Sequence, residues 1–221
     1  MPLREQAAMQ IKELILTNEL RPGQSLAIGQ LADYLGVSHT PIREALAMLE
    51  REGLVEMPPY GKASVTRIEA KDVREVWDMR LMFEGAAVDQ AVSALSDGAL
   101  AEIEGSLKRA RLNASCSDYG AHYESDVELH RTILQCVEND LFLELAGQVE
   151  DRSIRIRTLV EATANEGDVV SIVDEHLELL RALKARDRDA ARERLIRHLE
   201  AGKERTLAAL DELRNGGSDD E

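Results

Sequence analysis

Three histidines and one aspartate stand at positions where the surrounding sequence is apolar. Asp126 and His130 are spaced i, i+4 and therefore share one helix face, which the following apolar residues continue. His176 lies within a second apolar stripe, and His198 follows Leu195 by three residues on a third. Buried ionisable groups are unfavourable unless they are paired or bind a metal, so we expect the four side chains to meet. Together they form a nitrogen and oxygen donor set for a divalent ion, zinc first and nickel or manganese as alternatives.

These residues have a second interpretation. A single buried histidine is more often a hydrogen-bonded core residue than a metal ligand, and spacing alone leaves both interpretations open. His122 lies four residues before Asp126 on the same helix face. We expect His122 to be a neighbour of the cluster and not a fifth ligand.

A different chemistry is indicated nearer the N-terminus, from Gly36 to Leu46 and again at Glu52-Gly53-Leu54-Val55. Gly36 permits a tight turn, Ser38 suits a helix N-cap, and Pro41 falls in the first turn, where a missing N–H is tolerated. The apolar residues of this segment follow helical spacing and predict one buried face: Ile42, Ala45, Leu46 and Leu49. The pattern is typical of the turn and second helix of a helix-turn-helix.

The exposed N-terminal end of this helix carries side chains that can contact DNA in the major groove. They are Ser38, His39, Thr40 and Arg43. Tyr60 and Lys62 fall in a predicted turn between two short strands, a position from which they can reach the DNA backbone or the minor groove.

The elements around this motif predict a winged helix-turn-helix domain over residues 1–68. A first helix follows from apolar residues between Ala7 and Ile15, and Leu20-Arg21-Pro22-Gly23 ends it. Ser25 begins a second short helix, and Gly53 closes the third. A strand, a turn and a second strand follow, over residues 54–57, 58–62 and 63–66.

From residue 69 onward the sequence predicts amphipathic helices with short polar breaks. These helices cover residues 70–94, 97–113, 118–138, 140–163, 168–186 and 188–213. Asn139-Asp140 and Asn165-Glu166-Gly167-Asp168 are the clearest breaks, and residues 215–221 are expected to be a disordered tail. The predicted fold is therefore mainly α, with an all-α bundle of about six helices over residues 69–214.

The charge is distributed unevenly between the two predicted domains. The chain has 221 residues and a net charge of -15, but residues 1–68 contain seven Lys/Arg and eight Asp/Glu. The acidity therefore belongs to the helical bundle and not to the predicted DNA reader. A nearly neutral reader makes few phosphate contacts as a monomer, and dimerisation would double them.

Cysteine usage and hydropathy indicate the cellular compartment of the protein. Cys116 and Cys136 are isolated, without the spacing of a zinc finger or of a disulfide framework. Charged residues appear too early for a signal peptide, and no apolar run approaches the roughly 20 residues of a membrane span. We therefore expect a cytoplasmic protein without membrane contact.

One segment closely resembles the signature of GntR-type regulators. It is Ser38-His39-Thr40-Pro41-Ile42-Arg43-Glu44-Ala45-Leu46, with Glu52-Gly53-Leu54-Val55 behind it. Arg21-Pro22-Gly23 also fits this family. The later part resembles the FCD effector domain of the FadR subfamily at these places: Arg80-Leu81-Met82-Phe83-Glu84, Asp126 with His130, Glu175-His176 and His198. Six predicted helices are closer to the VanR branch than to the seven-helix FadR branch.

The resemblance implies a homodimer that binds a palindromic double-stranded operator and changes its affinity when a small molecule enters the bundle. In metal-bearing members an aspartate and three histidines hold the ion, and they match Asp126, His130, His176 and His198. Small carboxylates often complete the coordination there. Arg80 matches an arginine that often lines the pocket, where it can pair with a carboxylate. Its alternative role is an ion pair with Glu84 at i+4.

The chain departs from the family at two DNA-contact positions. His39 stands where arginine is usual, and Gly29 supplies no side chain where a polar or basic contact is common. Arg43 is retained and is the best single candidate for a base or phosphate contact. These departures concern the operator sequence and not the DNA-binding role.

The leading hypothesis is a transcription regulator, acting as a repressor, whose operator affinity is modulated by a small organic acid at the metal site. One alternative is a metal-dependent enzyme with an accessory DNA-binding domain, because a His/Asp site with open positions can activate water. The bundle offers no separate general base for it. Another alternative keeps the regulator and makes the metal purely structural.

Overall fold

The computed structural model describes residues 1–114, 120–160 and 166–216. The chain divides into two compact units, one of residues 1–69 with 154–159 and the other of residues 70–153 with 160–221. Each unit has a hydrophobic core of its own.

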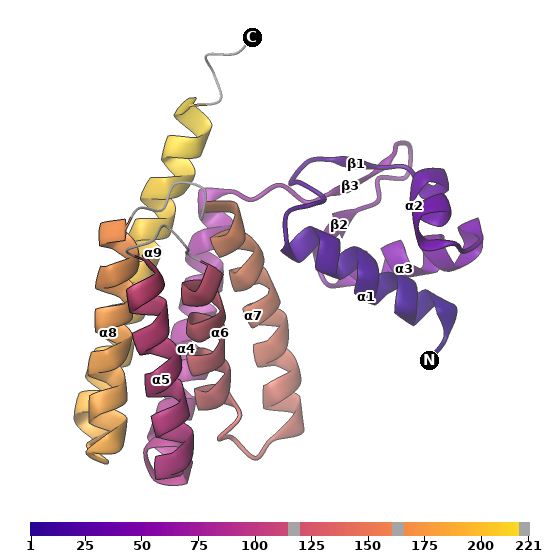
Figure 1. Ribbon diagram of the computed structural model, residues 1–221. Coiled ribbons are helices and arrows are strands. Elements are labelled where there is room, and N and C mark those ends of the chain that lie inside the picture. Colours follow the sequence, from indigo (N-terminus) through magenta and orange to yellow (C-terminus); the bar gives the residue numbers. More distant parts are fainter. Residues whose placement is uncertain (115–119, 161–165, 217–221) are drawn as a thin grey trace. The chain divides into compact units, whose positions relative to one another are not determined.

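The first unit contains three helices and a small sheet (Figure 1). Its helices are α1 (Leu3–Leu16), α2 (Ile28–Leu35) and α3 (His39–Arg51). Its strands are β1 (Ser25–Leu26), β2 (Val55–Glu56) and β3 (Ala63–Val65). The central strand is β3, which runs antiparallel to both neighbours. Helix-turn-helix and sheet together give the architecture that the sequence predicts.

The helix-turn-helix has the local features that its pattern predicts. Gly36 ends α2 in the left-handed conformation, with a φ of 67°, and Ser38 is the N-cap of α3. The Ser38 side chain makes no capping hydrogen bond with the described residues. The four apolar residues predicted to face inward are fully buried: Ile42, Ala45, Leu46 and Leu49. They form one core with Ile11 and Ile15 of α1.

Two predictions in this unit are wrong. Ser25 does not begin a helix, because it pairs with Ser64 in the sheet and α2 begins only at Ile28. This pairing joins segments that are far apart in the sequence, so local propensity does not indicate it. Helix α1 ends at Leu16 instead of continuing to residue 20, and Asn18 turns the chain with a φ of 59°.

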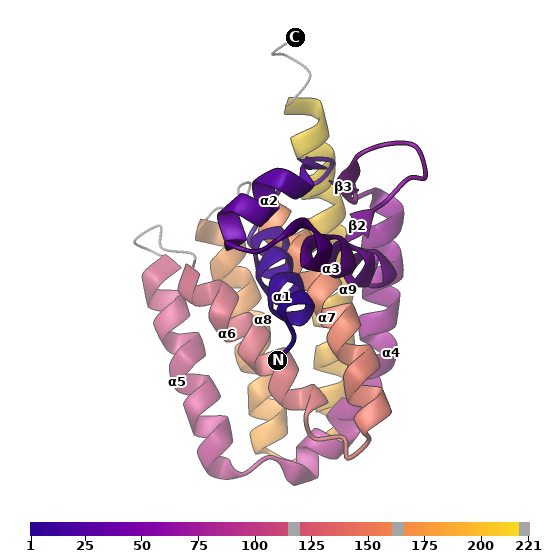
Figure 2. The same ribbon diagram turned by 90° about the vertical axis from the view of Figure 1, so that its right-hand side faces the viewer.

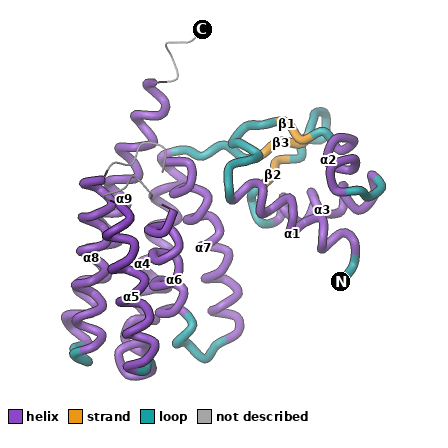
Figure 3. The backbone as a smooth tube through the Cα atoms, in the orientation of Figure 1, coloured by secondary structure: helices purple, strands orange, loops and turns teal. Residues whose placement is uncertain are grey.

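The second unit is an all-α bundle, and the described residues contain the six helices that the sequence predicts (Figure 3). They are α4 (Ala70–Ala94), α5 (Asp97–Ala114), α6 (Gly120–Leu134), α7 (Asp140–Val160), α8 (Glu166–Lys184) and α9 (Arg188–Gly216). Helix α4 packs along α9, and α5 contacts both α6 and α8 (Figure 2). This packing brings α4, α6, α8 and α9 around one interior.

Some helix boundaries differ from the prediction. Helix α6 ends at Leu134, before the predicted residue 138, and α8 ends at Lys184. Helix α8 begins at Glu166 and not at Asp168, and both acidic side chains lie in its first turn, where the helix dipole favours negative charge.

The predicted disordered tail is wrong at its start, because α9 continues through residues 215 and 216. Residues 217–221 lie outside the described residues, as do the predicted helix ends at 118–119 and 161–163. Within the described part of the chain, none of the helices combines the length and apolar character that crossing a membrane requires.

Candidate functional site

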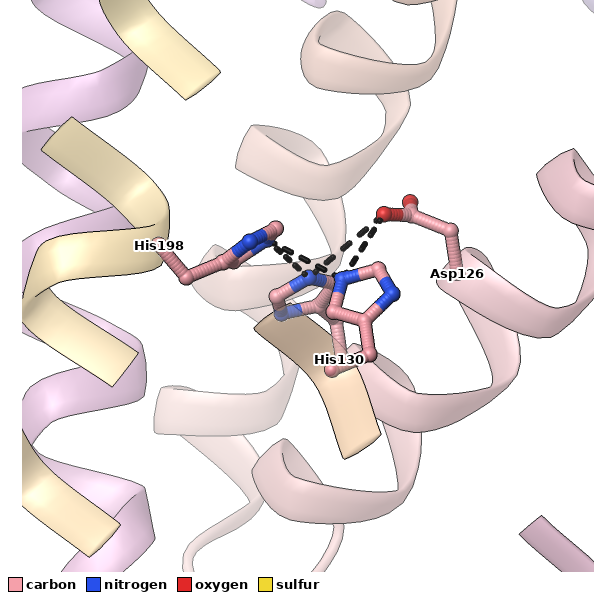
Figure 4. Close-up of side chains that lie close together, drawn as sticks. Asp126, His130 and His198 are labelled. Carbon is pink, nitrogen blue, oxygen red and sulfur yellow. Dashed lines mark hydrogen bonds and ion pairs between the residues drawn. The ribbon is translucent and has the colours of Figure 1, made fainter. Parts of the chain in front are cut away.

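Four potential metal ligands meet inside the bundle. Asp126 and His130 project from α6 one turn apart, whereas His176 comes from α8 and His198 from α9. All four are buried. Figure 4 shows His198 and Asp126 approaching from opposite sides, with His130 between them. The structure therefore brings together the four residues that the sequence pattern selected.

The distances between the donor atoms are those of one coordination shell. Nε2 of His198 lies 3.2 Å from Nε2 of His130 and 3.1 Å from Nε2 of His176. Oδ1 of Asp126 lies 3.3 Å from Nε2 of His176 and 3.7 Å from Nε2 of His130. Ligands that bind one zinc ion at about 2.0–2.2 Å are themselves roughly 3 to 3.5 Å apart. Three imidazole nitrogens and one carboxylate oxygen are thus spaced to share a divalent ion.

A buried carboxylate orients His130. Glu84 of α4 accepts a hydrogen bond from Nδ1 of His130 at 2.5 Å and another from Nε of Arg80 at 2.8 Å. Burial raises the pKa of Glu84, but the charges and hydrogen bonds of Arg80 and His130 outweigh burial and hold this pKa well below its usual range. An ionised carboxylate only accepts hydrogen bonds, so Nδ1 of His130 carries a proton.

His198 has the same arrangement with another carboxylate. Its Nδ1 donates to Oε2 of Glu175 at 2.8 Å, and Arg205 donates to both oxygens of Glu175 at 2.7 and 2.9 Å. Burial raises the pKa of Glu175, but hydrogen bonds from His198 and Arg205 lower it overall to about 2. Burial also lowers the pKa of His198 to about 4, so this ring is neutral at pH 7.

The proton positions explain why the donor set fits a cation. A neutral imidazole that donates from Nδ1 presents a lone pair at Nε2. His198 donates from Nδ1 to Glu175 and is neutral at pH 7, so its Nε2 presents a lone pair to the cluster, 3.2 Å from Nε2 of His130. A lone pair at this position can bind a cation. Geometry and protonation together fit a divalent metal ion.

Arg80 lies beside this centre in the ion pair that its spacing from Glu84 predicts. Its guanidinium carbon lies 5.4 Å from the centre of the Trp77 ring, and both residues are buried. Only Nε has a hydrogen-bond acceptor among the described residues, which leaves Nη1 and Nη2 as donors. The ion pair with Glu84 is therefore compatible with a contact to a ligand carboxylate.

His122 and Cys136 are not part of the cluster of four potential ligands. The ring of His122 is 6.5 Å from that of His176, measured between centroids, and His122 is not one of the four converging donors. Cys136 is a half-buried free thiol, and burial raises its pKa. Cys116 lies outside the described residues.

The residues predicted to contact DNA are all exposed on the first unit. They are Ser38, His39, Thr40 and Arg43 at α3, with Tyr60 and Lys62 between β2 and β3. Arg43 makes no ion pair or hydrogen bond within the described chain, so its guanidinium is available. The two unusual positions are neighbours in space, because a Cβ added at Gly29 would lie 4.0 Å from Nε2 of His39.

Sequence reasoning did not assign a role at the metal centre to Glu84, Glu175 or Arg205. Glu84 stands in the same motif as Arg80, and Glu175 directly precedes His176, so both motifs contained a signal. The signal is ambiguous, because Glu175 contacts His198 on the next helix and not its own neighbour. Only the packing of α8 against α9 identifies the partner.

Each of the two parts of the chain matches the model of a known protein family. Residues 3–61 match the model of the bacterial regulatory proteins of the gntR family, and residues 75–201 match that of the FCD domain. The HTH-type transcriptional repressor NanR of Cronobacter sakazakii is 28% identical over 217 residues, which span 89% of this chain and 82% of NanR.

Two solved structures resemble the chain. E. coli McbR/YncC has a TM-score of 0.81 at 23% identity, covering 94% of this chain and 98% of that one, which shows a shared fold. The Zn2+-bound FCD domain of TM0439 has a TM-score of 0.54 at 26% identity, covering 65% of this chain and 96% of that one. The second likeness shows that an FCD domain can bind metal.

Proposed function

Because the chain belongs to the GntR family of bacterial transcription regulators and carries an FCD domain, we propose that it is a repressor whose affinity for operator DNA changes when a small carboxylate binds at a metal ion in the bundle. Residues 1–68 read DNA in this proposal, and residues 69–214 sense the ligand. Both matched domains and the relative NanR are those of regulators and not of enzymes, so the enzyme alternative is dropped. A DNA-binding regulator of this kind acts in the cytoplasm.

The observation that carries the sensing part is the buried cluster of Asp126, His130, His176 and His198. We propose zinc as the ion, since three imidazoles and one carboxylate suit it, and the related FCD domain of TM0439 is Zn2+-bound. Nickel or manganese would use the same four residues. Such an ion, held by the four side chains, would attract the oxygens of a carboxylate ligand as a Lewis acid.

Arg80 is the proposed second anchor for the carboxylate effector. It is a buried cation whose Nη1 and Nη2 donors have no acceptor among the described residues. A guanidinium binds a carboxylate through paired N–H donors. A ligand held by the ion at one end and by Arg80 at the other would be selected as a small organic acid.

The proposed DNA reader has few cations to offer. Arg43 is placed to contact a base edge or a phosphate, Ser38 and Thr40 can bind phosphate, and Tyr60 and Lys62 can reach the backbone from the wing. His39 stands in place of the arginine that is usual at this position in the family. Two copies on a palindromic operator would double these contacts, and we therefore propose a homodimer.

An exposed apolar surface on the bundle supports dimerisation. Met79 and Met82 of α4 and Leu141 and Leu145 of α7 are exposed large hydrophobic residues. The two helices meet where Phe83 packs edge-on against Phe142, with ring centroids 5.0 Å apart. Exposed apolar patches on a soluble domain commonly mark an interface. We propose that this surface contacts a second copy.

The central test measures metal, effector and DNA binding in one preparation. Elemental analysis of the purified protein identifies the metal, and a thermal-shift screen of small carboxylates identifies candidate effectors. Fluorescence anisotropy with DNA from upstream of the protein's own gene then measures operator affinity with and without the effector. The proposal fails if metal-loaded protein binds this DNA with an affinity that no carboxylate changes.

His176→Ala separates sensing from a purely structural metal. Loss of the effector response with an unchanged melting temperature of the metal-free protein supports the sensing role. General unfolding of the variant supports the structural alternative. A response to chelator alone, without any carboxylate, identifies the metal itself as the signal.

A further inference from the structure

We propose that Glu175 and Glu84 are positioning residues that hold the proton of His198 and of His130 at Nδ1 and thereby set the affinity of the metal centre. The inference rests on the metal site of the proposed function and adds residues that lie outside its donor set. Carboxylates that accept from a metal-binding imidazole fix its tautomer and its orientation.

The Glu175 branch connects α8 and α9. Oε2 of Glu175 accepts from Nδ1 of His198, and Arg205 binds both carboxylate oxygens. Arg205 lies seven residues after His198, two turns along α9 on the same face, so both reach the same carboxylate. Arg205 thus holds Glu175 in the one position from which it can accept from His198.

The Glu84 branch repeats this arrangement from α4. Oε2 of Glu84 accepts from Nδ1 of His130, while Oε1 accepts from Nε of Arg80. Two histidines on different helices therefore have the same outer partners, a carboxylate followed by an arginine. This repetition argues for a shared task at the metal centre.

The task follows from the chemistry of imidazole. A neutral ring carries its proton on Nδ1 or on Nε2, and only the nitrogen without the proton can bind a metal. The cluster uses Nε2 of both His130 and His198. Without the carboxylate, a ring is free to place its proton on Nε2, and that tautomer must be lost before the metal binds.

Glu175 is the better residue for a test, because its side chain is 25% exposed whereas Glu84 is 2% exposed. The matched control is Glu178, which pairs with Arg194 at 2.7 Å between the same two helices and contacts no histidine in the described structure. Glu175→Ala and Glu178→Ala each remove one ion pair between α8 and α9, but only Glu175→Ala also removes a hydrogen-bond acceptor of a histidine.

The first measurement is 15N NMR of histidine-labelled, metal-free protein, which reports the tautomer of each ring. We expect His198 in the Nδ1–H form in the wild type and in Glu178→Ala, and a shift toward Nε2–H in Glu175→Ala. The second measurement is zinc affinity by competition with a chromophoric chelator. We expect Kd to rise about 10- to 100-fold in Glu175→Ala and to stay unchanged in Glu178→Ala.

Arg205→Ala, with Arg194→Ala as its control, keeps the inference testable if Glu175→Ala does not fold. It should weaken zinc binding less than Glu175→Ala does, and Glu175→Gln, which keeps an oxygen acceptor, should restore part of the affinity. Unchanged zinc affinity in folded Glu175→Ala, or an unchanged His198 tautomer, overturns the inference. Absence of zinc binding in the wild type overturns the proposed function instead, and the metal-free tautomer measurement still decides the role of Glu175.

Discussion

Arg80 and Glu84 form an ion pair inside the bundle, with Nε of Arg80 2.8 Å from Oε1 of Glu84 and side chains that are 6% and 2% exposed. Glu84 also accepts from His130, so three ionisable groups share one buried site. Removing water from such charges is unfavourable, and mutual pairing offsets the penalty only while every partner is present. Because Glu84 binds both Arg80 and His130, loss of the ion pair would affect the stability of the protein and also the orientation of His130.

Arg80→Met should destabilise the protein by about 3 to 5 kcal/mol, because it leaves a buried carboxylate without its cation. Urea unfolding of the metal-free protein measures this loss. Lys71→Met is the matched control, since Lys71 and Glu75 form an ion pair of the same spacing and orientation on the same helix, but exposed. Its loss should be at most about 0.5 kcal/mol. Equal losses in the two variants would contradict the buried pair.

Zinc should stabilise the folded protein through the four ligands. At a free zinc concentration 100 times Kd, binding to the native state adds about 2.7 kcal/mol, which corresponds to several degrees in Tm. Differential scanning calorimetry with zinc and with chelator measures the shift. His176→Ala should lose it, whereas His39→Ala, which changes an exposed histidine of the first unit, should keep it. A zinc-dependent shift that survives in His176→Ala would place the metal elsewhere.

The parts of this molecule that sequence could predict are those with a local signature. Ile42, Ala45, Leu46 and Leu49 repeat at helical spacing and are buried together. Asp126 and His130 stand within an apolar stripe of the same kind, and the stripe therefore predicts that their side chains point into the bundle. Periodicity records which face of a helix is buried, and it does so without knowledge of the partner helix.

What sequence could not predict depends on partners from distant segments. The sequence predicts a helix start at Ser25, but its pairing with Ser64 places this residue in a strand. Glu175 stands beside His176 yet orients His198, since the register of α8 against α9 selects the partner. Both outcomes are set by packing between elements and not by propensity within one.

Acid should destabilise the metal-free protein between about pH 6.5 and pH 4. The pKa of His198 is lowered by burial from 6.5 to about 4 in the folded protein, so over this range the unfolded chain binds a proton that the folded chain does not. Stability therefore falls as pH decreases through this window and the His198 contribution levels off below it. The shift corresponds to roughly 3 kcal/mol.

Urea unfolding of chelator-treated protein from pH 7.5 to pH 4 measures this slope. His198→Gln should flatten it, whereas His39→Gln, at an exposed position, should leave the wild-type slope. If the His198→Gln slope equals that of the wild type, the pH dependence originates in other groups.

Arg43→Ala should weaken operator binding without changing the fold. Loss of a specific base contact weakens the binding free energy by about 1 to 3 kcal/mol. Because each of the two copies on a palindromic operator loses the contact, the total loss should be twice as large. Arg51→Ala is the control, because Arg51 is also exposed on α3 but lies in its last turn. Anisotropy at several salt concentrations distinguishes a phosphate contact from a base contact. Unaltered binding by Arg43→Ala would show that α3 does not read the operator through this residue.

Gly202→Ala tests how tightly α4 and α9 pack beside the metal centre. A Cβ at Gly202 would lie 3.2 Å from Nε1 of Trp77, and Trp77 is 2% exposed with Arg80 over its ring, so the indole has little room to move. In an open helix position, replacing Gly by Ala stabilises by up to about 1 kcal/mol. Gly147→Ala in α7 should show that gain, because nothing lies within 4 Å of its added Cβ.

Gly202→Ala should instead lose about 1 to 2 kcal/mol through overpacking. Trp77 is the single tryptophan of the chain, so its fluorescence reports the packing directly and should change in Gly202→Ala but not in Gly147→Ala. Since His198 lies one turn before Gly202 on the same face of α9, the displaced indole should also weaken zinc binding. A gain in stability equal to that of Gly147→Ala would show that Trp77 and α9 are free to separate.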